Sequence, residues 1–467
     1  MRVSLAGSSL LPRIEQLWLA LIVFLLPTQF GRHFWPDSAL VYGIRVDYLA
    51  PTLYALDLLL LGHLVLKILN SKFEIRFLSP LFPILLTNLV FSHNPLATLS
   101  WSLHFVLYSV FVFTAFPGSP RSVLKRTSHI VSLPPFKILN SKFKIIKVLL
   151  SLAILFQVAL ALAQVIMGHS VGGLMYYLGE RTVSVGQPSI ALATFMGETV
   201  LRAYGTFGHP NVLAGWLLIT CLIVLRLGRL QSPKRANNLP SEGLTLKDAP
   251  TPNVVREGQT LWIPLSPKIL NSKFEIGLLA LSTLGIFLTQ SRAALFALLG
   301  LVIPVHFLRA SRTRALYVLV VALFVIRYSV FTPPRSDLSI SERLSLQKVS
   351  ALAIGHWPLF GTGASASIAT YPELDQSIRL LQPDHDSLTL LLSWFGLFGV
   401  LAIMYYLKNC LEFDCWNLII IMPLLLLDHY LLTSPQGLLI LLLYIRATIT
   451  RVPQSSTIGQ WPSTINH

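Results

Sequence analysis

IIKVLLSLAILFQVALALAQVIM, residues 145–167, is an almost uninterrupted apolar run in which Lys147 is the single charged residue. The hydrocarbon core of a bilayer is about 30 Å thick, and about 20 apolar residues cross it as an α-helix. The run therefore predicts a membrane-spanning helix, and similar runs recur along the chain on both sides of it.

The composition extends this prediction to the whole chain. Of its 467 residues, 54% are hydrophobic and 12% are charged, and the mean hydropathy is +0.66. Soluble domains carry about 25% charged residues, and so few ionic groups cannot cover the surface of a water-soluble enzyme. The values indicate a polytopic membrane protein. They exclude a soluble globular enzyme, a disordered scaffold and a disulfide-linked secreted domain.

Apolar runs of suitable length predict an all-α fold with about twelve transmembrane helices. The third, seventh and twelfth runs are the shortest. The expected spans lie near residues 14–30, 49–66, 77–91, 99–116, 145–167, 209–227, 276–290, 292–308, 314–331, 387–407, 416–432 and 435–447.

The distribution of Lys and Arg sets the orientation. With the N-terminus in the cytoplasm, 26 of the 36 basic residues fall on the inner side and 10 on the outer side. This ratio follows the positive-inside rule, so both termini are expected in the cytoplasm. Because the inner connections account for most of the net charge of +16, no nucleic-acid partner is expected.

Two connecting segments are long. Residues 228–275 are polar and rich in Pro, Ser and Asn, which is typical of a flexible linker. Residues 332–386 form one large extracytoplasmic loop between spans nine and ten. Within this loop an amphipathic helix is expected to open at Ser341-Glu342-Arg343, to place Leu346, Val349 and Ala353 on one face, and to stop at Gly355 and Pro358.

Three outer-side positions are candidates for chemistry, because ionisable residues near apolar spans are expensive. Arg202 opens the segment RAYGTFGHPN (202–211), Arg292 follows Ser291 at a helix start, and His385 lies where the large loop enters span ten. Each also has a structural interpretation: Arg202 as an interface anchor, Arg292 as a topology signal, and His385 as a capping residue with Asp386. Together, two Arg and one His on one face favour an anion site beside a titratable base.

These motifs resemble the O-antigen ligase and O-antigen polymerase superfamily of integral-membrane glycan transferases. The likeness covers about residues 200–405, and its parts occur in order. They are Arg202 with Gly205, Phe207, Pro210 and Asn211; Ser291-Arg292; Arg343 followed by Pro358, Leu359, Gly361 and Gly363; and His385, Asp386 and Leu388 followed by Gly396 and Gly399.

The resemblance implies a mechanism. Members transfer a glycan from an undecaprenyl-pyrophosphate carrier to an acceptor hydroxyl on the outer face of the inner (cytoplasmic) membrane. Arg202 and Arg292 would then hold the pyrophosphate, and His385 would orient or deprotonate the acceptor. The other motif residues, expected to bind substrate, are Arg343, Asp386, Ser291, His209 and Asn211.

One position departs from the family pattern, which usually places Asn after the His where this chain has Asp386. A carboxylate there would raise the basicity of His385 if the two are in contact, or would compete with an anionic substrate. No cofactor or metal is expected. The resemblance implies none, and the loop has no dense acidic cluster for a divalent ion.

The resemblance also implies three regions: an amino-terminal bundle (1–200), a ligase- or polymerase-like core with the outer loop (201–410), and carboxy-terminal spans (411–467). The partners would be the lipid bilayer, a lipid-linked donor, and a lipid, glycan or protein acceptor. A lipid or glycan transporter and a non-catalytic scaffold remain alternatives, and the sequence does not separate ligase from polymerase.

Overall fold

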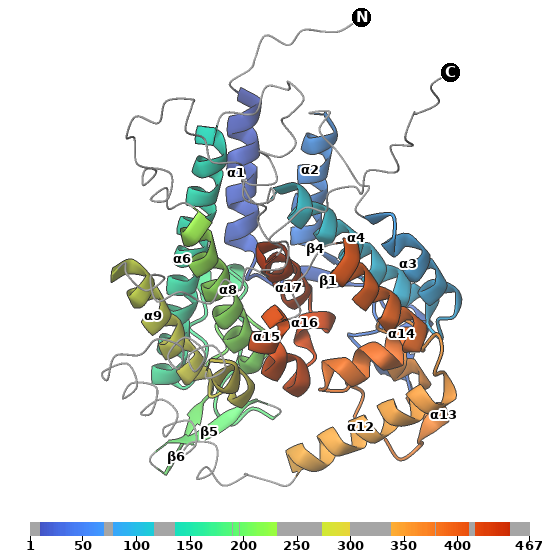
Figure 1. The fold of residues 1–467 in the computed structure, drawn as a ribbon. Coiled ribbons are helices and arrows are strands. Elements are labelled where there is room, and N and C mark those ends of the chain that lie inside the picture. The colour runs from blue at the N-terminus through green and yellow to red at the C-terminus, as the bar shows by residue number, and fades with distance from the viewer. Residues whose placement is uncertain are drawn as a thin grey trace, which may run out of the picture.

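The computed structural model of the chain describes residues 10–69, 78–115, 136–188, 190–195, 197–230, 273–298, 338–378, 380–410 and 416–448. These residues are mostly helical (Figure 1). The longer helices are α1 (Leu10–Leu25), α2 (Ala55–Leu69), α3 (Leu81–Val90), α4 (Pro95–Ala115), α6 (Phe136–Met167), α8 (Pro210–Leu230), α9 (Lys273–Thr289), α12 (Leu338–His356), α14 (Ser387–Tyr405), α15 (Trp416–Leu427) and α17 (Pro435–Thr448).

The helices have the length and surface of a membrane protein. Four are long and apolar enough to cross a bilayer: Pro95–Ala115, Ile145–Met167, Pro210–Leu227 and Ser387–Lys408. Large apolar side chains such as Leu17 and Ile166 are 72% and 74% exposed, and a bilayer would cover them. The expected span 314–331 lies outside the described residues, and only residues 292–298 of the eighth span are described, so the number of twelve stays a prediction.

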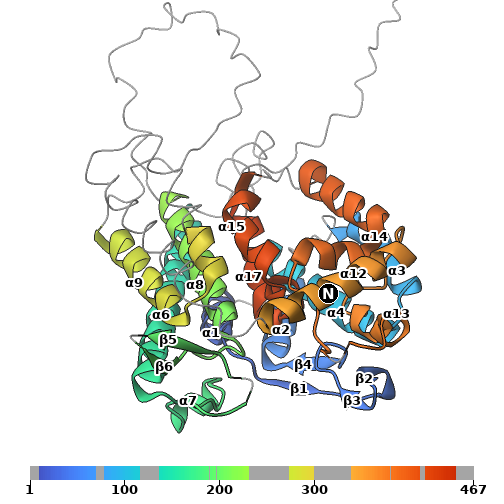
Figure 2. The ribbon, with the colours of Figure 1, turned by 90° about the horizontal axis from the view of Figure 1, so that it is seen from below.

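Helices α6, α8 and α9 pack together on one side of the molecule, and α3, α4, α12 and α14 on the other (Figure 2). Helix α17 lies between the two groups and contacts both α8 and α4. Helices α1 and α2 pack side by side, α1 also against α6 and α2 against α4. The main apolar core runs through these contacts and includes Trp216, Tyr108 and Phe111.

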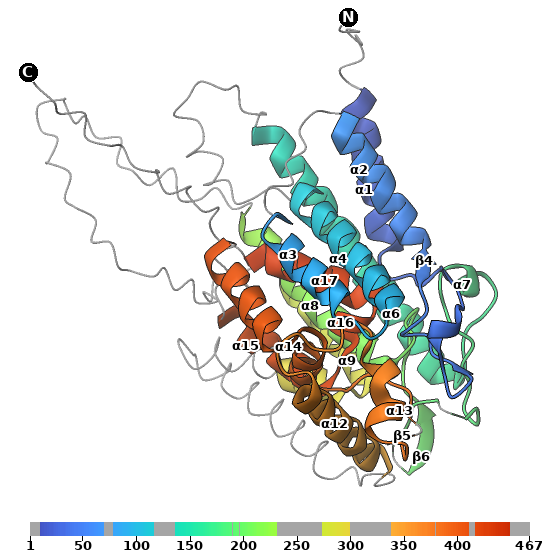
Figure 3. The same cartoon turned by 90° about the vertical axis from the view of Figure 1, so that its right-hand side faces the viewer.

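Small strands and short helices gather at one end of the bundle (Figure 3). Three small two-stranded antiparallel sheets form there beside a bundle that is mostly helical, as expected: β1 (Gly31–His33) with β4 (Thr52–Tyr54), β2 (Leu40–Val41) with β3 (Ile44–Arg45), and β5 (Leu192–Phe195) with β6 (Glu198–Leu201). The short helices are α7 (Leu174–Tyr177) and α13 (Tyr371–Leu374).

Hydrogen bonds join these connections to one another. Thr206 Oγ1 donates to the carbonyl of Pro27 (2.7 Å), and the backbone N–H of His93 donates to the carbonyl of Thr362 (2.9 Å). At the other helix ends, Lys67 pairs with Glu15 (2.7 Å) and Lys147 with Glu275 (3.3 Å). The alternation of spans predicts that the connections containing Pro27, Thr206, His93 and Thr362 all lie on one side of the membrane. We call this end of the bundle the site end.

The helix expected from Ser341 to Gly355 is present as α12, whereas the large loop between spans nine and ten stays a prediction. Leu346, Val349 and Ala353 are all buried, at 0%, 0% and 1% exposure. The first two join a second apolar cluster with Leu49 and Tyr371, among others. The loop therefore folds onto the connection between α1 and α2 with a core of its own, and it holds the segment before α14 in place.

Helix α14 is broken at Gly396, where the backbone takes φ 61°. The segment 358–363 fills the break: Thr362 N and Gly363 N donate to the carbonyls of Ser393 (2.7 Å) and Trp394 (3.0 Å), and Leu397 N donates to the carbonyl of Pro358 (2.8 Å). The two glycine motifs that carried the family likeness thus form one structural unit, in which the loop supplies the hydrogen bonds that the broken helix loses.

Candidate functional site

Arg202 lies between β6 and α8, and two hydrogen bonds fix the direction of its guanidinium. Its Nε donates to the carbonyl of Thr289 (2.8 Å), and its Nη2 donates to Oδ1 of Asn211 in the first turn of α8 (2.7 Å). The Thr289 contact ties Arg202 to the turn that carries Ser291 and Arg292. The two arginines named by the sequence therefore belong to one end of the bundle.

Asn211 extends this chain to a carboxylate. Its Nδ2 donates to Oδ2 of Asp428 (2.8 Å), which lies in the break between α15 and α16 (Tyr430–Thr433). The carboxylate also accepts from the backbone N–H of His429 (3.0 Å), and Ser387 Oγ donates to the carbonyl of Asp428 (2.8 Å). Asp428 is buried, at 5% exposure, so this carboxylate is held between the starts of α8, α14 and α16.

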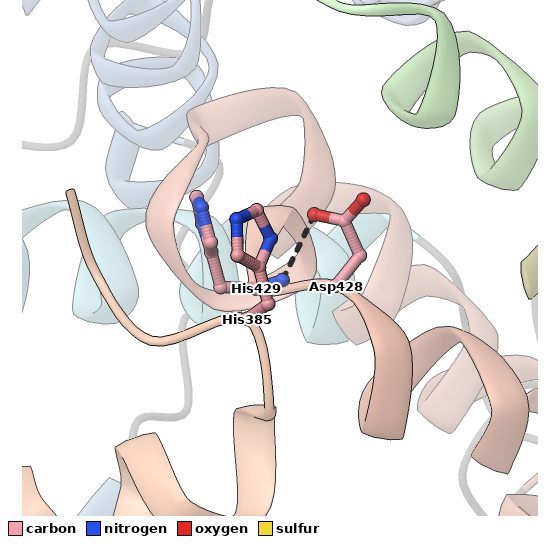
Figure 4. Close-up of side chains that lie close together, drawn as sticks. All are labelled: His385, Asp428 and His429. Atoms are coloured by element: carbon pink, nitrogen blue, oxygen red, sulfur yellow. Dashed lines mark hydrogen bonds between the residues drawn. The ribbon is translucent and has the colours of Figure 1, made fainter. Parts of the chain in front are cut away.

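His385, Asp428 and His429 lie side by side (Figure 4). One ligating atom from each lies within 4.8 Å of those of the other two, and the two imidazole centroids are 5.1 Å apart. Nδ1 of His429 is hydrogen-bonded to Thr433 Oγ1 (2.7 Å). Nδ1 of His385 is buried and has no hydrogen-bond partner among the described residues, which is uncommon for a buried polar atom.

Arginines and the carboxylate act on the histidines in opposite directions. Burial lowers the pKa of His385, Asp428 opposes this by favouring the charged ring, and Arg343 of α12 adds to the lowering. His209 keeps solvent access on one side, but the protein packed around its other sides lowers its pKa, with Asp428 opposing and Arg202 reinforcing the shift. Both rings are therefore biased towards the neutral form, which can accept a proton.

Asp386 has the capping role that was one of the structural interpretations of this motif. Its Oδ1 accepts from the backbone N–H of Leu388 (2.9 Å) and its Oδ2 from Thr389 Oγ1 (2.7 Å), so it is the N-cap of α14. The carboxylate that acts on His385 is Asp428, which comes from a different part of the chain. The conditional expectation that Asp386 raises the basicity of His385 is replaced by this arrangement.

The other sequence candidates lie on helix starts at the site end. The backbone N–H of Asn211 donates to Nδ1 of His209 (3.2 Å), and the carbonyl of His209 accepts from Val212 and Leu213, which caps α8. Ser291 is buried and its Oγ accepts from the N–H of Ala294 (3.5 Å), while Arg292 is exposed at the first residue of the helix 292–298. Arg343 is half-buried on α12.

Two glutamines of α6 hold the turn after Arg202. Oε1 of Gln164 accepts from the N–H groups of Tyr204 (3.0 Å) and Gly205 (2.8 Å), and Oε1 of Gln157 accepts from Thr206 N (3.1 Å). Both glutamines are fully buried. A Cβ on Gly208 would lie 3.1 Å from the guanidinium carbon of Arg181, which places another cation beside this turn.

Sequence reasoning missed Asp428, His429 and Arg181. Asp428 and His429 were hidden inside the run 416–432, which was treated as one continuous span. The available signal was an ionisable pair within an apolar run, because ionisable residues in membrane spans are expensive and most often functional. No family model, curated protein or solved structure matches the chain.

Proposed function

We propose that the chain is an integral-membrane glycosyltransferase that moves a glycan from an undecaprenyl-pyrophosphate carrier to an acceptor hydroxyl at the outer face of the cytoplasmic membrane. One observation carries the proposal: Arg202 and Asn211 of the segment 202–211 converge at the site end with Asp428 and His385, which come from two other parts of the chain. This convergence supplies cations for a diphosphate and a base for a hydroxyl in one place. The remaining expected spans and the cytoplasmic termini belong to the same proposal.

The donor half of the reaction needs positive charge near the leaving group. Arg202 and Arg292 are joined through the 289–292 turn, and Arg343 is close enough for its charge to act on His385 and His209. Guanidinium groups bind phosphate oxygens in a bidentate manner. They would hold the pyrophosphate and stabilise the charge that grows on it as the glycosidic bond breaks.

The acceptor half needs a base, and His385 has the position for it. The acceptor oxygen forms the new bond to the anomeric carbon of the donor sugar, and its proton goes to a ring nitrogen of His385. The carbon–oxygen bond to pyrophosphate breaks, and its electron pair leaves with the carrier. Asp428 stabilises the imidazolium that results, so it acts as a positioning residue. Because the acceptor oxygen displaces the pyrophosphate in one step, inversion at the anomeric carbon is expected.

Asp386, in the place where the family usually has Asn, is compatible with His385 acting as the base. Asn and Asp cap helices about equally well, so the residue that the family usually has would make the same cap on α14. The departure from the family pattern therefore lies at a capping position, where either residue serves, and leaves the base itself unchanged.

The test is turnover of a pyrophosphate-linked glycan by the purified full chain in lipid nanodiscs. Release of undecaprenyl pyrophosphate is followed with a lipid, a peptide or a second donor molecule as acceptor. The wild type and His356→Ala, an exposed histidine on α12, should release the carrier, whereas His385→Ala and Arg202→Ala should lose at least about 100-fold in rate. A wild type that binds the donor but never releases the carrier would overturn the proposal in favour of a transporter or a scaffold.

A further inference from the structure

We infer that His385, Asp428 and His429 form a binding site for one divalent transition-metal ion of the Zn²⁺ class. The sequence indicated no metal, and the proposed transfer reaction does not use one. The site is a juxtaposition that only the fold creates, because His385 precedes α14 whereas Asp428 and His429 lie in the break after α15.

The donor set selects the class of metal. Two imidazoles and one carboxylate are the ligands of many three-ligand zinc sites, in which a fourth position stays open for water. Mg²⁺ and Ca²⁺ prefer sets made of oxygen atoms. With one carboxylate and two neutral nitrogens, the site favours Zn²⁺, Co²⁺ or Ni²⁺ over these hard cations.

The spacing is close to that of a loaded site. One ligating atom from each residue lies within 4.8 Å of the others. Tetrahedral zinc with bonds of about 2.0–2.1 Å brings its ligand atoms to about 3.3 Å from one another. Closing the difference requires side-chain rotation, and Nδ1 of His385 can move without breaking a hydrogen bond, because it makes none to the described residues.

The surroundings orient the other two ligands. Nδ1 of His429 is bonded to Thr433 Oγ1 (2.7 Å), which leaves Nε2 as the nitrogen for a metal ion. Asp428 is held by Asn211 Nδ2 (2.8 Å) and by the backbone N–H of His429 (3.0 Å). Such outer contacts to a ligating histidine and carboxylate are typical of metal sites and set the ligand geometry.

Metal binding would have a consequence for catalysis, and this consequence alone rests on the proposed function. A ring nitrogen that coordinates a metal has no lone pair for the proton of an acceptor hydroxyl. A bound Zn²⁺ ion would therefore take His385 out of the transfer reaction, and micromolar zinc would inhibit an enzyme that is fully active in the presence of a chelator.

The direct test measures metal binding without turnover. The full chain in nanodiscs is dialysed against buffered Zn²⁺, and bound zinc is measured by mass spectrometry; Co²⁺ is then loaded in its place and its visible spectrum recorded. The wild type should bind one ion more than His385→Ala and His429→Ala. The matched control His356→Ala should bind as the wild type does, and Thr433→Val should weaken binding about 10-fold or more through the lost contact to His429.

Equal zinc content in the wild type and His385→Ala would overturn the inference, as would equal loss in His356→Ala. His385→Ala removes a side chain with no hydrogen bond to the described residues, so it is expected to fold, and a thermal melt verifies this. The two proposals fail separately. Glycan transfer in chelator without zinc binding leaves only the transferase, and zinc binding without transfer under any condition leaves only the metal site.

Discussion

Asn211 and Asp428 are 217 residues apart in the sequence and share a hydrogen bond of 2.8 Å, with the amide of Asn211 as donor. The other end of the same amide accepts from Arg202 (2.7 Å). One side chain therefore stands between a guanidinium and a buried carboxylate and presents the correct polar atom to each. The two hydrogen bonds fix the distance between the guanidinium of Arg202, which is assigned to the donor pyrophosphate, and the carboxylate of Asp428, which lies beside His385.

Replacing this amide separates hydrogen bonding from charge. Asn211→Ala leaves a buried carboxylate oxygen and an arginine N–H with one partner fewer, at a cost of about 1–3 kcal/mol. Asn211→Asp keeps the acceptor for Arg202 but sets a second carboxylate against Asp428, so it should be the less stable variant. Thermal unfolding of both variants in the same detergent ranks them. An Asn211→Asp variant as stable as the wild type would show that the contact is absent.

The junction between the large loop and α14 gives a prediction with controls in the same chain. Gly361 and Gly396 both have positive φ, and a Cβ on Gly361 would lie 2.5 Å from the carbonyl of Trp394. Gly361→Ala and Gly396→Ala should therefore unfold the loop or lower stability by more than about 2 kcal/mol. Gly277→Ala and Gly355→Ala are the controls.

At both control positions the added Cβ meets no atom of the described chain within 4 Å, and the glycine is helical. Because Ala is the better helix former by about 1 kcal/mol, these two variants should be neutral or more stable. Limited proteolysis of the loop, with a thermal melt, measures both effects. Equal behaviour of the four variants would contradict the proposed junction.

The sequence predicted the parts of the fold in which apolar residues recur with a clear period. The amphipathic spacing of Leu346, Val349 and Ala353 located α12 and its buried face. The small sheets were missed because strands of two to four residues, such as β2 and β6, are too short to show an alternation. Their pairing depends on contacts at the site end that no local pattern contains.

The sequence predicted the motif residues of the candidate site, but it did not predict Asp428 and His429 or the contacts among the side chains. Arg202, Asn211 and His385 were named from motifs, but the carboxylate considered as a contact of His385 was its neighbour Asp386. Adjacency in sequence suggested contact, whereas the N-cap geometry turns that carboxylate towards the N–H of Leu388. The contact with Asp428 crosses from one helix start to another, and spacing along one chain cannot show it.

Asp386 and Asp428 should accordingly respond differently to removal of charge. Asp386→Asn preserves the cap and should transfer glycan within a few-fold of the wild-type rate, while Asp386→Ala should lose about 1 kcal/mol of stability. Asp428→Asn removes the charge beside His385 and should lower the rate at least about 100-fold. The transfer assay and melting curves compare the three variants. A large rate loss in Asp386→Asn would support the interpretation drawn from the sequence, in which Asp386 acts on His385.

Gln164 tests whether the turn after Arg202 needs its support from α6. This side chain is fully buried, accepts from the N–H groups of Tyr204 and Gly205, and donates to Glu180 Oε1 (2.8 Å). Gln164→Leu has a similar volume but takes the acceptor from the N–H groups of Tyr204 and Gly205, at about 1–3 kcal/mol for each one. Glu180 Oε1 loses one donor and keeps the N–H of Val171. The variant should be less stable and should bind the donor more weakly, because Arg202 loses its fixed direction. Ser151→Ala on the same helix is the control and should change neither quantity, because among the described residues its hydroxyl bonds only to the helix carbonyl of Lys147 (2.8 Å). A Gln164→Leu variant with wild-type melting and an unchanged KM for the donor would show that the turn holds Arg202 without α6.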